Sequence, residues 1–276
     1  MKVFIAGIAC SLACLFLGAS QGSASLLTEN CGTTEHPSRI RRVVGGHDAN
    51  RFENPWMVMV IGKDNMFVCG GSLITSLFVL TSASCISSSP KQVSLGEYDR
   101  NCRSEDCLSS RKLIDIEQQF IHPQFQYYQN DIALLRLATE VVFSAYIRPI
   151  CLSVDRPVGS HIREFTATGW GKTDSSETSN VLQTTTLKLH NPIHCNDKFR
   201  TKLDASQLCI GGEHSDTCNG DSGGPLSAKV SGGKTDRVFL FGLVSYGSSF
   251  CSGIAVYTNV QHYRDWIVNT IAMQGS

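Results

Sequence analysis

Short apolar runs, separated by clusters of glycine, serine, asparagine and aspartate, recur along the chain from Val43 onward. The runs are rich in β-branched and aromatic residues, as strands usually are. The clusters between them are typical of turns. The pattern therefore predicts an all-β protein. The clearest runs are WMVMVIG (56–62), SLFVLTS (76–82), IALLRL (132–137), FTATGWG (165–171) and VFLFGLVSYG (238–247).

One segment at the C-terminal end has a different period. In NVQHYRDWIVNTI (259–271) the apolar residues recur at helical spacing, so we expect an α-helix that packs on the core. Its predicted core residues are Val260, Tyr263, Ile267 and Ile271, with Trp266 beside them.

The N-terminal segment has the pattern of a secretory signal. Lys2 precedes an apolar run (3–17) and then small residues that suit cleavage after Ala19 or Ala24. A membrane anchor is the alternative, but the run is short for a bilayer span and contains several small residues. No later segment is long and apolar enough to span a membrane. We therefore expect a secreted, extracellular protein without a membrane partner.

Composition and charge narrow the function classes. With 276 residues, 42% of them hydrophobic, the chain can fill one large domain or two compact halves. Lys and Arg number 24, Asp and Glu number 24, and no stretch concentrates one sign. A partner with a phosphate backbone needs such a stretch, so we exclude nucleic acid.

The cysteines fit an oxidising compartment. Of twelve, Cys10 and Cys14 leave with the signal, and ten remain. Their irregular spacing, without CxxC pairs, favours five disulfides over a zinc site, although spacing alone does not give the connectivity.

The strongest local motif is DTCNGDSGGPL (216–226), in which glycines flank Ser222. Glycine allows a tight turn that exposes the hydroxyl while backbone N–H groups converge on a developing oxyanion. With this motif the chain resembles the chymotrypsin and trypsin family of serine proteases, most of all its secreted arthropod members. The resemblance runs from about Val43 to the C-terminal helix. It implies two six-stranded antiparallel β-barrels with a C-terminal α-helix.

The resemblance also assigns catalytic positions. Ser222 stands at the nucleophile position, and the N–H groups of Gly220 and Ser222 stand at the oxyanion hole. In NDIALLRL, Asp131 matches the carboxylate that orients the catalytic imidazole.

An activation site is implied by RVVGG. Cleavage between Arg42 and Val43 frees an α-amino group, which in the family pairs with the aspartate before the nucleophile, here Asp221. The expected organisation is a signal peptide (1–24), a light chain or activation segment (25–42) and a protease domain (43–276).

The primary specificity pocket is matched by five residues. Asp216 at its base favours Arg or Lys, because a buried carboxylate makes charge-assisted hydrogen bonds with them. Ala255 stands where the family usually has glycine, so its methyl group is expected to crowd a long basic side chain. The matched residues are Asp216, Thr217, Ser245, Gly247 and Ala255.

The resemblance implies a full set of disulfides and one weak metal site. The acids of the loop around Cys102, especially Glu97 and Glu105, suggest calcium, although surface acids often cluster without a metal, and we expect no cofactor. The implied pairs are Cys31–Cys151, Cys69–Cys85, Cys102–Cys107, Cys195–Cys209 and Cys218–Cys251.

The general base is missing from this pattern. CGGSLITSLFVLTSASC (69–85) resembles the family segment that ends Ala-Ala-His-Cys, and its cysteines fix the register, so Ser84 occupies the histidine position. A hydroxyl cannot accept the nucleophile's proton near neutral pH, whereas imidazole can. Neither His122, in a surface loop, nor His214, behind the pocket, is expected to replace it. A substrate that supplies its own imidazole is a narrow alternative.

We therefore expect a non-catalytic protease homologue that binds proteins, either proteases or substrates, in an extracellular cascade. Two alternatives stay open. The first is an active endopeptidase that cleaves after Arg or Lys with another base. The second is a structural or adhesive module that acts through unrelated loops.

Overall fold

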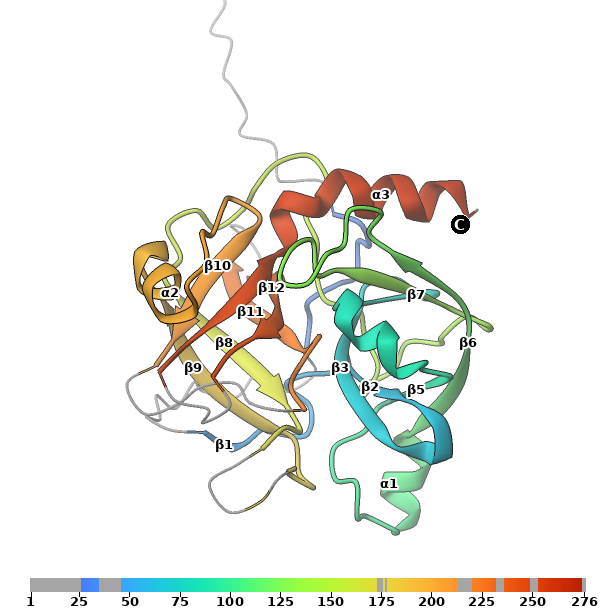
Figure 1. The fold of residues 1–276 in the computed structure, drawn as a ribbon. Coiled ribbons are helices and arrows are strands. Elements are labelled where there is room, and N and C mark those ends of the chain that lie inside the picture. The colour runs from blue at the N-terminus through green and yellow to red at the C-terminus, as the bar shows by residue number, and fades with distance from the viewer. Residues whose placement is uncertain are drawn as a thin grey trace, which may run out of the picture.

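The computed structural model describes residues 26–34, 46–172, 176, 178–212, 220–231, 236–248 and 253–274. These residues form two closed six-stranded antiparallel β-barrels and a C-terminal helix, so the predicted fold is confirmed (Figure 1). Among the described residues, no helix has the length and apolar character needed to cross a bilayer.

The first barrel is built by the N-terminal half of the chain, and its strands close in the order β2-β3-β4-β7-β6-β5. Every residue of β2 and β4 is buried, because these strands carry two of the predicted apolar runs. The strands are β2 (Met57–Ile61), β3 (Phe67–Leu73), β4 (Phe78–Thr81), β5 (Gln92–Leu95), β6 (Lys112–Ile121) and β7 (Ala133–Leu137).

The second barrel follows in the C-terminal half. Its strand order is β9-β10-β13-β12-β11-β8, and pairing of β8 with β9 closes it, while β1 (His47–Asp48) adds an edge to β9. The strands are β8 (Glu164–Gly169), β9 (Gln183–Leu189), β10 (Gln207–Gly211), β11 (Pro225–Ser231), β12 (Asp236–Tyr246) and β13 (Ile254–Asn259).

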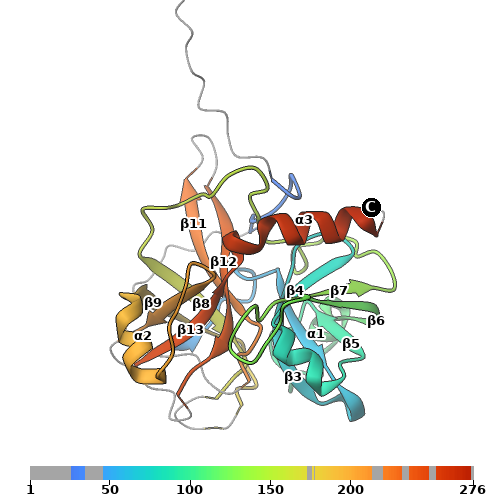
Figure 2. The same ribbon diagram turned by 45° about the horizontal axis from the view of Figure 1, so that its top comes forward.

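The C-terminal helix connects the two barrels. It begins as the 3-10 turn η3 (Val260–Tyr263), continues as α3 (Arg264–Met273) and runs from the second barrel across the first (Figure 2). The four predicted core residues of this segment are buried and share one cluster with Trp56 of the first barrel and Leu243 of the second. This burial explains the helical spacing in the sequence.

In the described part of the chain, four shorter helical segments lie in loops. The α-helix α2 begins where Asn191 accepts the N–H of Ile193 and Pro192 occupies the first turn. The sequence pattern predicted only the C-terminal helix. The four segments are η1 (Lys63–Asn65), η2 (Ala83–Ser88), α1 (Glu105–Ser110) and α2 (Pro192–Phe199).

Four disulfides lie within the described residues, and one of them joins segments that are distant in sequence. Cys31–Cys151 ties residues 26–34 to the body, where Leu27 and Gly32 also donate backbone hydrogen bonds to Leu152 and Pro149. The other described bonds are Cys69–Cys85, Cys102–Cys107 and Cys195–Cys209. Cys218 and Cys251 lie outside the described residues, as do the whole signal peptide expected over 1–24 and, of the activation segment expected over 25–42, residues 25 and 35–42.

Candidate functional site

The turn that carries Ser222 lies between the two barrels. The main chain of β3 supports it, since the Gly70 N–H donates to the Ser222 carbonyl oxygen at 2.9 Å. Gly223 has a φ of +75°, and a Cβ there would stand 2.2 Å from the Thr81 Oγ1 atom. Glycine is therefore required, because a side chain would meet both backbone strain and the neighbouring strand.

The N–H groups of this turn differ in whether they have an acceptor. The Gly223 and Gly224 N–H groups bond to the carbonyl oxygens of Val244 and Asp221, each at 2.8 Å. Within the described part of the chain, the N–H groups of Gly220 and Ser222 donate no hydrogen bond. Their role as an oxyanion hole stays a prediction.

Ser84 lies on η2 and contacts Asp131 with both its backbone and its side chain. The Ser84 N–H donates to Asp131 Oδ1 at 2.7 Å, and the Ser84 hydroxyl donates to Asp131 Oδ2 at 3.1 Å. The Ser245 hydroxyl donates to the same Oδ2 at 2.6 Å. The carboxylate is thus satisfied on both oxygens without an imidazole.

The environment of Asp131 is buried. Only 5% of this residue is exposed, and burial raises the pKa of its carboxyl, while hydrogen bonds from Ser245 and Ser84 act in the opposite direction. The Thr258 hydroxyl binds the Asp131 carbonyl oxygen and fixes the backbone as well. Sequence reasoning placed Ser245 only in a pocket wall and missed its bond to Asp131.

The Cys69–Cys85 disulfide brings the Ser84 and Ser222 segments together. Cys85 Sγ lies 3.6 Å from the Ser222 carbonyl oxygen and 2.9 Å from the Ser82 hydroxyl. The structure therefore gathers Ser84, Asp131 and Ser222, which are far apart in sequence, in one region between the barrels.

None of the six described histidines forms a hydrogen bond with Ser84, Asp131 or Ser222. His122 packs against Tyr263 and Trp266, with 5.2 Å between ring centroids in each pair. Burial, with a smaller effect from His262, lowers its pKa. His214 lies outside the described residues.

Of the five residues predicted to form the primary pocket, three are described by the structure. The Ser245 hydroxyl is engaged by Asp131, and Gly247 directly follows the end of β12. Ala255 is buried on β13, where a Cβ built on Gly247 would lie 3.1 Å from the Ala255 Cβ. The Ala255 methyl group therefore faces the backbone of Gly247. Asp216 and Thr217 lie outside the described residues, so crowding of the pocket stays a prediction.

The Asp221 carboxylate lies against Gly169 and Gly171, which together form a glycine cradle. The Gly171 N–H donates to Asp221 Oδ1 at 2.8 Å, and a Cβ on either Gly169 or Gly171 would lie within 2.4 Å of a carboxylate atom. Sequence reasoning missed this cradle, although the GWG triplet (169–171) is its signal. Arg42 and Val43 lie outside the described residues, so their link to Asp221 stays a prediction.

The proposed calcium ligands differ in their surroundings. Arg111 Nη2 donates to Glu97 Oε1 at 2.8 Å, and Arg111 Nε reaches Glu97 Oε2 at 2.5 Å, so a guanidinium already engages both oxygens. Glu105 is exposed on α1, and the described residues contain no group of three or more potential metal ligands. A calcium ion at Glu97 would have to displace Arg111.

The family model described as "Trypsin" matches residues 43–267. The chain belongs to the trypsin family. The resemblance seen in the sequence is therefore confirmed.

Similar proteins include several from Drosophila melanogaster. The protein is 32% identical over 260 residues to serine protease grass, a match that covers 85% of this chain and 69% of that one. It is 35% identical to Melanization protease 1 over 83% of this chain and 66% of the relative. It is 34% identical to Spaetzle-processing enzyme over 82% and 65%. The matches thus span about two thirds of these relatives.

A solved structure supports the same assignment. The crystal structure of Drosophila Grass, titled a clip serine protease of the Toll pathway, superposes with a TM-score of 0.73 at 31% identity. The match covers 89% of this chain and 75% of that chain.

Proposed function

We propose that this trypsin-family protein is a secreted, non-catalytic homologue that binds a protein segment at the site without cleaving it efficiently. The observation that carries the proposal is the pair of bonds from Ser84 to Asp131, at 2.7 and 3.1 Å, where the family resemblance expects an imidazole. A serine hydroxyl can satisfy the carboxylate, but it cannot accept the Ser222 proton near neutral pH.

The size of this defect favours binding over catalysis. Loss of the catalytic histidine alone lowers kcat of the protease subtilisin by about 2 × 10⁶, which corresponds to roughly 8–9 kcal/mol. An acceleration of about 10³ to 10⁴ over water can remain from the oxyanion hole and binding. Such a rate does not sustain a proteolytic cascade.

The remaining parts of the site fit a bound peptide. The N–H groups of Gly220 and Ser222, which have no acceptor among the described residues, would bind a peptide carbonyl oxygen, and Asp216 would bind an Arg or Lys side chain. Ala255 would shorten the pocket and would weaken the binding of a long side chain more than that of a short one. These roles need no proton acceptor.

Cleavage after Arg42 would act as the switch. The new α-amino group at Val43 would enter the glycine cradle around Asp221, and Cys31–Cys151 would retain the light chain. The relatives named Spaetzle-processing enzyme and Melanization protease 1 support a place in an extracellular cascade, with a protease or a protease substrate as partner. The described disulfides are compatible with that compartment.

The test measures chemistry at Ser222 directly. The Arg42-cleaved protein is treated with a fluorophosphonate probe and with an arginine ester or anilide, and Ser222→Ala is the matched control. We expect labelling and hydrolysis at the level of the control. Turnover at ordinary protease rates that Ser222→Ala abolishes would overturn the proposal and establish the active endopeptidase instead.

A further inference from the structure

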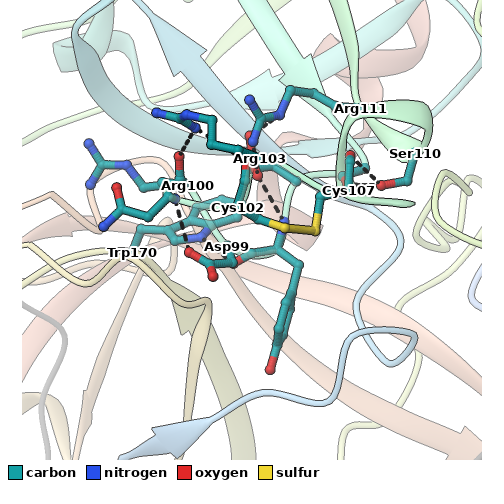
Figure 3. Close-up of polar contacts among 12 residues, drawn as sticks. Asp99, Arg100, Cys102, Arg103, Cys107, Ser110, Arg111 and Trp170 are labelled. Atoms are coloured by element: carbon teal, nitrogen blue, oxygen red, sulfur yellow. Dashed lines mark hydrogen bonds and ion pairs between the residues drawn. A yellow bond between two sulfur atoms is a disulfide. The ribbon is translucent and has the colours of Figure 1, made fainter. Parts of the chain in front are cut away.

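Arg100 presents a positive charge close to the Ser222 turn. Its Cζ atom lies over the Phe67 ring, 5.2 Å from the centroid, and Nη1 makes one long hydrogen bond to the Ser179 carbonyl oxygen at 3.4 Å. Within the described residues no carboxylate forms an ion pair with Arg100, whereas Arg111 of the same loop is paired with Glu97 (Figure 3). A guanidinium has five N–H donors, so the described residues use only a small part of its hydrogen-bonding capacity.

Phe67 links this guanidinium to the site. The Phe67 Cε1 atom lies 3.5 Å from the Cβ position of Gly220, two residues before Ser222. The ring also packs edge-on against Trp170, with 6.3 Å between centroids. Arg100 is therefore separated from the nucleophile turn by the width of one aromatic ring.

The backbone around Arg100 is fixed before any ligand arrives. The Arg100 N–H donates to the Asn180 carbonyl oxygen at 2.9 Å, and the Trp170 indole N–H donates to the Tyr98 carbonyl oxygen at 3.2 Å. The Cys102–Cys107 disulfide closes the following loop. A fixed backbone and a ring-supported guanidinium reduce the entropy lost on binding.

The neighbouring charges have other contacts. Asp99 Oδ1 accepts the Asn101 N–H at 2.9 Å, and Glu97 is paired with Arg111. Arg103 is exposed, and its Nη1 donates to the carbonyl oxygens of Arg100 and Cys102. Arg103 thus carries the same charge on the same loop without an aromatic contact to the site.

We propose that Arg100 and Phe67 form a subsite that binds an acidic side chain of the protein segment lying over Ser222. A guanidinium supported on a ring keeps its in-plane N–H groups free for a carboxylate, and its weak hydration makes desolvation less costly. The subsite lies on the side of the first barrel, whereas Gly247 and Ala255 of the primary pocket belong to the second. This inference rests on the proposed function, because it requires a segment bound across the site.

The test uses fluorescent nine-residue peptides with a central arginine and a single glutamate at each other position in turn. Each is paired with a peptide that has glutamine there, and one peptide has alanine in place of the arginine. Fluorescence polarisation gives Kd values for the Arg42-cleaved protein and for Arg100→Gln, Arg100→Lys and Arg103→Gln. Equal unfolding midpoints establish that each variant is folded.

We expect the peptide with glutamate at one particular position to bind about fivefold more tightly at low salt than the peptide with glutamine at that position. This difference in affinity should shrink as salt is added. Arg100→Gln should abolish that preference, Arg100→Lys should retain part of it and Arg103→Gln should leave it intact. Equal loss in Arg103→Gln, or persistence in Arg100→Gln, overturns the assignment.

Failure of the two proposals gives different results. Peptides that require the central arginine but show no glutamate preference overturn the acidic subsite alone. Absence of binding by every peptide overturns the proposed function together with the subsite.

Discussion

Replacing Ser84 with histidine should restore proteolysis to the Arg42-cleaved protein. The site is prepared for an imidazole, because Asp131 is fixed by the Ser84 backbone N–H at 2.7 Å and by the Ser245 hydroxyl at 2.6 Å. Neither bond uses the Ser84 side chain. An imidazole N–H can take over the bond that the Ser84 hydroxyl makes to Oδ2 at 3.1 Å.

The expected gain follows from the cost of losing the base. That loss is about 2 × 10⁶ in subtilisin. We expect the predicted crowding by Ala255 to offset part of the gain, since an extra methyl group in a packed site costs about 1–3 kcal/mol, or roughly one to two factors of ten in rate. We therefore expect kcat/KM for an arginine substrate to rise by about 10⁴ to 10⁶.

The assay follows hydrolysis of an arginine anilide by the wild type, Ser84→His, Ser84→Ala and Ser84→His with Ser222→Ala. Only Ser84→His should hydrolyse the arginine anilide at protease rates. Its rate should rise with pH through the titration of the new imidazole, near about pH 7. The variant without Ser222 separates catalysis at this site from contamination.

Two outcomes distinguish the base from the pocket. A folded, cleaved Ser84→His protein that does not react with a fluorophosphonate refutes the reasoning, because the nucleophile turn itself is then incompetent. Labelling by the fluorophosphonate without hydrolysis of the arginine substrate would mean that the pocket, and not the nucleophile, prevents cleavage. Addition of Ala255→Gly should then restore hydrolysis.

Three further predictions concern stability, each measured by urea unfolding. Arg111→Gln should lower the free energy of unfolding by about 3 kcal/mol, since Glu97 is left buried and unpaired, and an unchanged midpoint would contradict this pairing. Burial raises the pKa of Asp131, so the folded protein holds this proton more tightly than the unfolded chain does. The contribution of Asp131 to stability is therefore present at low pH and falls as pH rises from the ordinary carboxyl pKa to the raised one, and Asp131→Asn should flatten this part of the pH profile. Gly223→Ala should cost about 2 kcal/mol or more, because its Cβ would meet Thr81; a variant of wild-type stability would refute that clash.

The sequence pattern predicts strands well where both faces are buried. All five residues of β2 are buried, and its run of apolar residues is visible without a structure. β6 is different, because polar residues alternate along it and Leu113 and Ile121 are exposed. Its position depends on main-chain pairing with β5 and β7, which single-residue preferences do not encode.

Motifs located the site, but not its hydrogen bonds. The register from Cys69 to Cys85 predicted Ser84 at the histidine position, and this assignment stays a prediction. The contacts between Ser84 and Asp131 join residues 47 apart in sequence and depend on how β4 and β7 pair. Arg111 was missed for a similar reason, since only the return of the chain through α1 into β6 brings it to Glu97.

The contacts of Ser84 separate the structural role of Asp131 from the catalytic role that the family resemblance predicts for it. A buried carboxylate needs donors whether or not a reaction occurs, because leaving one of its oxygens unpaired costs about 1–3 kcal/mol or more. A small apolar residue at position 84 would leave Oδ2 with the Ser245 hydroxyl as its side-chain donor, whereas serine supplies a second. Serine therefore maintains the hydrogen bonding of the buried carboxylate, and under the proposed function it stands in place of the proton acceptor. The proposed function, binding without efficient cleavage, leads us to expect this combination of properties at position 84.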